Sequence, residues 1–309
     1  MECLAGIRRI GSARLKKITS IASHVALIIV LAGACVSPLA AEDALPDAYR
    51  SAKSALEAGD AAKAAAILML RLPDAKGEQR GVMLFTLGVA LLKLDRPADA
   101  ERHLAEARSH FENSAKLAET WALLGDARAA QSKSAEAAQA YGEAVRTSGT
   151  PDAPIARYAA ARSGELAAAD FLAKGDALSA VGKLRAAAAL SAERSAIIQT
   201  RLGEIAGNRK LRGEATAAAT FALGEIEQRD GHLPEAIAYY QRVFVSWLKY
   251  PAWVARSYLR AAECFDKLGK RKEAIAHLQE MMRKAERLQG QPEFAEARAR
   301  LIEWTPPTR

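Results

Sequence analysis

The chain has few aromatic residues and few cysteines for its length. Aromatic residues make up 6% of its 309 residues, and its three cysteines are Cys3, Cys35 and Cys264. Cys264 would stand alone once a leader is removed, which excludes an internal disulfide framework. It lies in the apolar stretch 261–265, where we expect a buried, unreactive thiol. Proline is scarce between about residues 155 and 230, as in uninterrupted helices.

A strong excess of one charge is also missing. The formal net charge is +8, but the first 41 residues carry five basic residues and one acidic residue, so half of that excess belongs to them. The remainder is close to balanced and shows no basic stripe with interleaved aromatic residues. Nucleic acid is therefore not an expected partner.

The motifs of catalysis and of metal or phosphate binding are missing too. His103 and His110 are seven residues apart, whereas a zinc-binding helix places two histidines at i and i+4. There is no strand followed by a Gly-rich phosphate loop, no Gly-x-Ser-x-Gly nucleophile turn, and no evident histidine partner for Cys264. We therefore expect a protein that is not an enzyme and that holds no cofactor or metal.

Residues 1–41 have the pattern of a secretory signal peptide. The apolar run 18–34 is followed by small residues up to Ala41 and is preceded by basic residues. These are Arg8, Arg9, Arg14, Lys16 and Lys17. A charged segment, an apolar segment and a small-residue exit mark an export signal. We expect cleavage after Ala41 and a soluble periplasmic product.

Two alternatives remain open for this leader. The stretch Leu31-Ala-Gly-Ala-Cys35 is an imperfect lipobox, with alanine where leucine is expected three residues before the cysteine. Lipidation at Cys35 would make an outer-membrane lipoprotein. An uncleaved leader would instead be an anchor, although the apolar run barely reaches the ~18 residues that a span needs. Association with a membrane is expected only in these two cases.

The rest of the chain repeats a pair of helices. The clearest copy has Trp121, Leu124-Gly125 in the first helix, and Ala137, Tyr141 and Ala144 in the second. Small residues let two helices approach closely, and the larger residues between them fill the gaps. The second-helix alanine recurs at intervals of 36 to 56 residues. Its six copies are Ala64, Ala100, Ala137, Ala180, Ala236 and Ala274. This repetition predicts an all-α fold, an α-solenoid of helical hairpins.

These residues resemble the tetratricopeptide repeat (TPR) family, whose unit of about 34 residues runs Trp, Leu-Gly, Tyr, Ala, Phe/Tyr, Ala, Pro. The unit around Trp121 matches residue by residue, and a later unit keeps Leu223-Gly224, Gly231, Ala236 and Tyr240. The resemblance implies that the inner face of the first helices lines a groove for another protein or a peptide.

The stretch 222–282 is also similar to exported bacterial cell-envelope TPR proteins of the Tol–Pal-associated and outer-membrane-assembly types. The phrases that carry this similarity are Gly231-His-Leu-Pro-Glu-Ala236 and Arg256-Ser-Tyr-Leu-Arg-Ala-Ala-Glu-Cys-Phe265. They imply a scaffold in the cell envelope and leave the complex unnamed.

The spacing predicts four segments. These are a signal peptide over 1–41, an N-terminal repeat block over 42–150, an irregular helical middle over 151–212, and a C-terminal repeat block over 213–309 with a capping helix. The predicted helices span 47–58, 61–71, 80–94, 97–110, 115–131, 134–147, 154–173, 177–190, 192–208, 212–230, 233–248, 252–267, 271–288 and 292–303.

The candidate binding residues lie in the last two repeats, where the predicted groove face combines charges, apolar residues and a concentration of aromatics. They are Phe221, Glu225, Gln228, Arg229, Trp247, Trp253, Arg256, Leu259, Glu263, Asp266 and Lys267. A solvated helix face accounts equally well for the charged members. Packing at a repeat junction accounts for the two tryptophans, although such residues also dominate binding hot spots.

Two functions follow as hypotheses. The first is an exported, non-enzymatic scaffold or adaptor that binds another cell-envelope protein through its repeat groove. The alternative is a helper subunit that carries a ligand or peptide for a secreted or peptidoglycan-active enzyme complex. The adaptor requires a shallow open groove, whereas a ligand carrier requires an enclosed apolar pocket.

Overall fold

The computed structural model describes residues 47–112, 115–211 and 213–305, and the predictions for the leader concern residues outside these ranges. The described residues form helices joined by short turns and contain no strand, so the prediction of an all-α helical repeat is confirmed. The chain divides into two compact units, one up to Ala159 and one from Ala160 onward. The predicted limits of the repeat blocks, at residues 150 and 212, say where regular repeats begin and end and not which residues form a compact unit. They therefore stay predictions.

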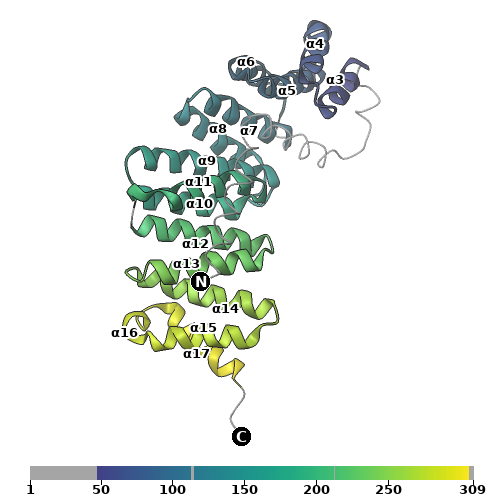
Figure 1. The fold of residues 1–309 in the computed structure, drawn as a ribbon. Coiled ribbons are helices and arrows are strands. Elements are labelled where there is room, and N and C mark those ends of the chain that lie inside the picture. Colours follow the sequence, from purple (N-terminus) through teal and green to yellow (C-terminus); the bar gives the residue numbers. More distant parts are fainter. Residues whose placement is uncertain (1–46, 113–114, 212, 306–309) are drawn as a thin grey trace. The chain divides into compact units, whose positions relative to one another are not determined.

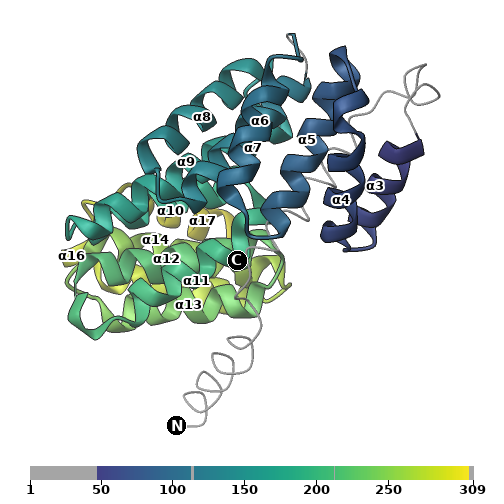
Figure 2. The ribbon, with the colours of Figure 1, turned by 90° about the horizontal axis from the view of Figure 1, so that it is seen from above.

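The first unit is a succession of helical hairpins. Each helix packs on the next along the chain from α3 to α8, and α5 also contacts α3 and α7. Figure 2 shows α3, α4 and α5 side by side. The helices are α3 (Asp47–Glu57), α4 (Ala61–Arg71), α5 (Gly77–Lys93), α6 (Pro97–Arg108), α7 (Ala115–Ala130), α8 (Ser134–Thr147) and the first part of α9 (Pro154–Ala173).

The second unit continues from α9 with the same kind of packing. Figure 1 shows α12, α13, α14 and α15 stacked in chain order. The helices are α10 (Ala177–Leu190), α11 (Ser195–Gly207), α12 (Glu214–Arg229), α13 (Leu233–Ser246), α14 (Pro251–Lys267), α15 (Arg271–Arg283), α16 (Ala285–Leu288) and α17 (Pro292–Trp304). Short 3₁₀ turns cover Leu72–Asp74, Ala192–Arg194 and Arg209–Leu211.

Small residues bring the two helices of a hairpin together, as the sequence predicted. The six second-helix alanines, from Ala64 to Ala274, are fully buried. A Cβ added at Gly224 would lie 2.7 Å from the ring of Tyr240, and one at Gly88 would lie 2.5 Å from Leu104. The glycines in the first helices are therefore required by close approach.

The turns between paired helices use left-handed backbone. Gly231 has φ +83° and Gly269 has φ +73°, which a residue with a side chain rarely adopts. Asp95 (φ +54°) and Ser132 (φ +61°) adopt the same conformation in the turns after α5 and α7. The turn geometry is thus shared by repeats that lack the glycine.

The helix bounds agree with the predicted ones to within two residues except at three places. Helix α5 begins three residues before the predicted 80, and the predicted helix 192–208 opens with a 3₁₀ turn. The predicted helix 271–288 is broken at Lys284, between α15 and α16. The break lets Leu288, which is 2% exposed, join the core that α17 completes through Ala297.

Helix α11, which was predicted over 192–208, lies in the long interval between Ala180 and Ala236. It packs on both α10 and α12, and those two helices also contact each other directly. The buried residues of α9 to α12 form one core cluster, and those of α12 to α17 form another. Cys264 is fully buried in the latter cluster, so the expectation of a buried cysteine is confirmed, and burial raises the pKa of its thiol to about 11.

Candidate protein-binding surface

Apart from the two tryptophans, the predicted set contains two apolar residues, and both are buried. Phe221 of α12 is 1% exposed and Leu259 of α14 is 4% exposed. The ring centroid of Phe221 lies 5.4 Å from that of Tyr240 and 5.5 Å from that of Trp253. Both residues were expected to line an open face of the repeats. They are buried instead, because their large side chains fill the spaces between α12, α13 and α14.

Glu225 forms an ion pair with a residue from another hairpin. Its carboxylate binds the guanidinium of Arg185, on α10, through two hydrogen bonds, and the Nη2–Oε1 distance is 2.6 Å. The same guanidinium lies over the ring of Phe221, with 5.5 Å between its carbon and the ring centroid. The hydrogen bonds to Glu225 raise the pKa of Arg185. The pair bridges α10 and α12 across the α11 insertion.

Arg229 and Gln228 are also engaged. Nη1 of Arg229 donates to the carbonyl oxygen of Ala188 and Nη2 donates to the hydroxyl of Ser195, while Nε pairs with Asp230 at 2.9 Å. The Ala188 carbonyl belongs to the last turn of α10, where helix carbonyls lack intrahelical partners. Gln228 Oε1 accepts a hydrogen bond of 2.7 Å from the hydroxyl of Tyr240.

The two tryptophans are partly buried on either side of the turn between α13 and α14. Trp253 donates from Nε1 to Glu214 at 3.0 Å, and the guanidinium carbon of Arg256 lies 5.1 Å from the centroid of its ring. Trp247 ends α13, and Arg242 lies 5.9 Å from the centroid of its ring. Both pack against the core of the second unit and leave part of the ring accessible.

The charged residues of α14 form ion pairs with the C-terminal helix and with their own helix. Arg256 Nε lies 2.8 Å from Glu293 of α17. Glu263 pairs with Arg260 at 2.8 Å and with Arg300 at 2.6 Å. Burial raises the pKa of Glu263, but the hydrogen bonds from the two arginines outweigh it and hold the pKa below its usual range.

The last two predicted residues lie at the end of α14. Asp266 pairs with Arg271 at the start of α15, and Lys267 is exposed. The structure thus brings Glu225, Gln228 and Arg229 together on α12 and Arg256, Glu263, Asp266 and Lys267 on α14. Whether these residues bind a partner stays a prediction.

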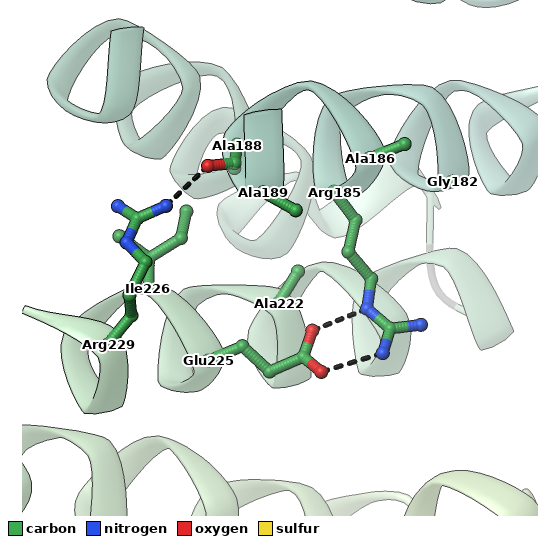
Figure 3. A pocket seen from close by; sticks show the side chains of 9 residues that line it. All are labelled: Gly182, Arg185, Ala186, Ala188, Ala189, Ala222, Glu225, Ile226 and Arg229. Atoms are coloured by element: carbon green, nitrogen blue, oxygen red, sulfur yellow. Dashed lines mark hydrogen bonds and ion pairs between the residues drawn. The ribbon is translucent and has the colours of Figure 1, made fainter. Parts of the chain in front are cut away.

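A cavity of about 390 Å³ opens beside this surface (Figure 3). Helix α12 contributes Glu225 and Arg229 of the predicted set, and α10 contributes residues that the sequence reasoning missed. The full lining is Gly182, Arg185, Ala186, Ala188, Ala189, Ala222, Glu225, Ile226 and Arg229. The sequence signal was the spacing of Gly182, Ala186 and Ala189, which places small residues along one helix face.

The described residues provide no grouping of three or more histidine, cysteine, aspartate or glutamate side chains suited to a metal ion. None of the helices within 47–112, 115–211 and 213–305 combines the length and the apolar character that crossing a bilayer requires. The surface that the structure does present consists of ion pairs, partly exposed indole rings and a small apolar cavity. Such a surface suits the recognition of a polypeptide.

Residues 215–287 match the family model of the tetratricopeptide repeat. This segment covers most of α12, all of α13 and α14, and α15, so the repeat predicted for the last two hairpins is confirmed. The finer similarity to Tol–Pal-associated or outer-membrane-assembly proteins stays a prediction. No curated protein matches the chain significantly.

Several solved structures match much of the chain, each with a TM-score below 0.5. PilF of Pseudomonas aeruginosa is 16% identical, with a TM-score of 0.36 over 82% of this chain and 96% of that one. A Rap protein in complex with Competence and Sporulation Factor is 14% identical, with a TM-score of 0.40 over 83% and 73%. The complex of the yeast Sti1 TPR2AB domain with pHSP90 is 14% identical, with a TM-score of 0.32 over 83% and 95%.

Proposed function

We propose that the chain is an exported, non-enzymatic adaptor that binds another cell-envelope protein through the α12 and α14 surface of its second unit. The observation that carries this proposal is the match of residues 215–287 to the tetratricopeptide repeat, together with the ion pairs and indole rings on that surface. Repeats of this kind present extended surfaces to protein partners. The absence of catalytic motifs in the sequence favours a binding role over a chemical one.

The alternative, a helper subunit that carries a ligand, is less well supported. A ligand carrier buries most of its ligand in an enclosed pocket. The cavity beside α12 instead has an open side, because Gly182, Ala186 and Ala189 along α10 are exposed. An open cavity favours a docked polypeptide segment over an enclosed small molecule.

Export is proposed from the leader. The pattern of basic residues, apolar run and small residues up to Ala41 supports cleavage there and a periplasmic product. Intact-mass measurement of the protein purified from its native host tests this. A mature chain that begins at Glu42 is expected, whereas a lipidated chain that begins at Cys35 would make the protein membrane-tethered.

The adaptor role is tested by affinity capture of the tagged full-length protein from envelope extracts, followed by mass spectrometry. Lys267→Glu reverses an exposed charge on α14 and is expected to lower partner recovery several-fold. Lys272→Glu is the matched control, because Lys272 is an exposed lysine on the neighbouring helix α15. Exposed substitutions such as these change stability by about 0.5 kcal/mol or less. The proposal fails if no envelope protein is enriched over an untagged control.

A further inference from the structure

The cavity between α10 and α12 has apolar walls made of unusually small side chains. Ala222 and Ile226 of α12 are buried and form its base. Gly182, Ala186 and Ala189 of α10 are exposed along its edge. Because none of these α10 residues has a side chain longer than a methyl group, the space between the two helices stays open.

The two arginines of the lining differ in how much hydrogen-bonding capacity they retain (Figure 3). All three nitrogens of Arg229 have partners, so this side chain clamps α12 to the end of α10 and the start of α11. Arg185 uses Nε and Nη2 for Glu225, and its Nη1 makes no hydrogen bond to any described residue. At one end of the cavity every nitrogen of the Arg229 guanidinium is therefore hydrogen-bonded. At the other end, Nη1 of Arg185 still has N–H donors to offer.

The lining of the cavity carries one more positive than negative side chain, and Asp230, outside the lining, pairs with Arg229 at 2.9 Å. The lining contains the guanidinium groups of Arg185 and Arg229 and one carboxylate, that of Glu225. A negatively charged group at the Arg185 end would add a favourable partner to Nη1, whereas a positive group would be repelled.

We propose that this cavity anchors a segment of the partner protein in which an apolar side chain stands next to an aspartate or glutamate. The apolar side chain fills the space between Ala222, Ile226 and the small residues of α10, and the carboxylate accepts hydrogen bonds from Nη1 of Arg185. The cavity volume lies near the lower limit of the range of about 300–1,000 Å³ for ligand pockets, which suits one side chain of a peptide. This inference rests on the proposed adaptor function and adds the chemistry of the bound segment.

Three capped synthetic heptapeptides test the inference. The first is made of glycine and serine with one Asp-Leu pair at its centre, the second replaces the leucine by alanine, and the third replaces the aspartate by asparagine. Amide shifts of the ¹⁵N-labelled full chain report binding. The Asp-Leu peptide is expected to shift amides of α10 and α12 and to bind at least about five-fold more tightly than the other two, since each replacement removes one of the two contacts.

Filling the cavity provides the matched variants. A Cβ added at Gly182 or at Gly203 meets no atom within 4 Å, so both positions accept a larger residue without a clash at Cβ. Gly182→Leu places its side chain in the cavity and is expected to abolish the shifts. Gly203→Leu, an exposed position on α11 outside the lining, is expected to leave them unchanged. Far-ultraviolet circular dichroism checks that both variants are folded.

Arg185→Gln tests the carboxylate contact separately. Because it removes the guanidinium and leaves Glu225 without this partner, it is expected to bind the Asp-Leu peptide no more tightly than the Asn-Leu peptide. Equal binding of these two peptides by the unmodified protein would overturn the acidic part of the proposal, and equal binding of the Asp-Leu and Asp-Ala peptides would overturn the apolar part. Absence of shifts with all three peptides would overturn both.

The capture experiment distinguishes this inference from the adaptor function. If Gly182→Leu recovers the envelope partner as well as the unmodified protein, the cavity is not the anchor, although the adaptor function stands. If the peptides bind at the cavity but no envelope protein is captured, the adaptor function fails while the assignment of the cavity stands.

Discussion

The ring of Tyr240 lies so close to Gly224 that a Cβ on the glycine would stand 2.7 Å from it. Tyr240 is fully buried, so its ring has no space into which to move. The contact draws α12 and α13 together, and the hydroxyl of the same tyrosine reaches Gln228 one turn further along α12. Burial raises the pKa of Tyr240 well above its usual value, which keeps this hydroxyl protonated as a donor.

Gly224→Ala is therefore expected to destabilise the protein by about 1–3 kcal/mol through overpacking. Gly142→Ala is the matched control, because Gly142 is also inside a helix but an added Cβ there meets no atom within 4 Å. The control is expected to stabilise by about 0.5–1 kcal/mol, since alanine is the better helix former. Urea unfolding monitored by circular dichroism measures both. Similar effects of the two substitutions would contradict the packing argument.

Replacing Ser132 by glycine is expected to stabilise the protein. Its φ of +61° is left-handed, and the equivalent turns after α12 and α14 use Gly231 and Gly269. Left-handed backbone costs an ordinary residue roughly 1–2 kcal/mol, whereas glycine adopts it freely but loses more entropy on folding. Ser132→Gly should therefore raise the free energy of unfolding by about 0.5–1 kcal/mol. Gly231→Ser should lower it by a comparable amount, and thermal unfolding of both variants checks the sign.

Glu165 and Arg194 form a buried ion pair, and removing one of the two partners should lower the stability of the protein. Arg194 Nε and Nη2 lie 2.7 and 2.8 Å from the two carboxylate oxygens of Glu165, and both residues are at most 2% exposed. Arg194→Met leaves a buried carboxylate and should cost about 3 kcal/mol. That is the lower end of the usual range, because Arg162 also lies within 3.3 Å of Glu165.

The companion to that experiment is the double variant Arg194→Met with Glu165→Leu. It removes both charges and is expected to recover most of the lost stability, because a buried ion pair is often no better than packed apolar side chains of similar size. Chemical unfolding of the single and double variants measures the difference. A double variant as unstable as the single one would show that the pair is needed for more than charge neutralisation.

The lowered pKa of Glu101 predicts that the folded protein loses stability in acid. Burial raises the pKa of this carboxyl, but hydrogen bonds from Lys133, Gln131 and Arg128 outweigh it and lower the pKa to about 2. A folded-state pKa below the unfolded value of about 4.3 contributes stability that is complete above pH 5 and is lost as the pH falls toward 2. Glu101→Gln should therefore be less stable than the unmodified protein at pH 6 and closer to it at pH 2.5. Unfolding curves across this range measure the convergence.

Much of the fold follows from local sequence pattern. The six second-helix alanines, the turn glycines and the 3.6-residue periodicity sufficed to place most helices within three residues of their bounds. The burial of Cys264 followed from the apolar residues around it. These features depend on each helix or hairpin by itself, because the residues that encode them are close in the chain.

The candidate binding surface depends on contacts between hairpins that are far apart in the chain. The sequence alone predicted that Glu225 lies on the groove face of α12, but only the tertiary structure decided that this carboxylate meets Arg185, from which it is separated by the whole of α11. It also decided that Phe221 and Leu259 are buried and that a cavity opens beside α10. The physical reason is that periodicity specifies which face of a helix is apolar, whereas pairing across helices depends on how an inserted helix displaces its neighbours.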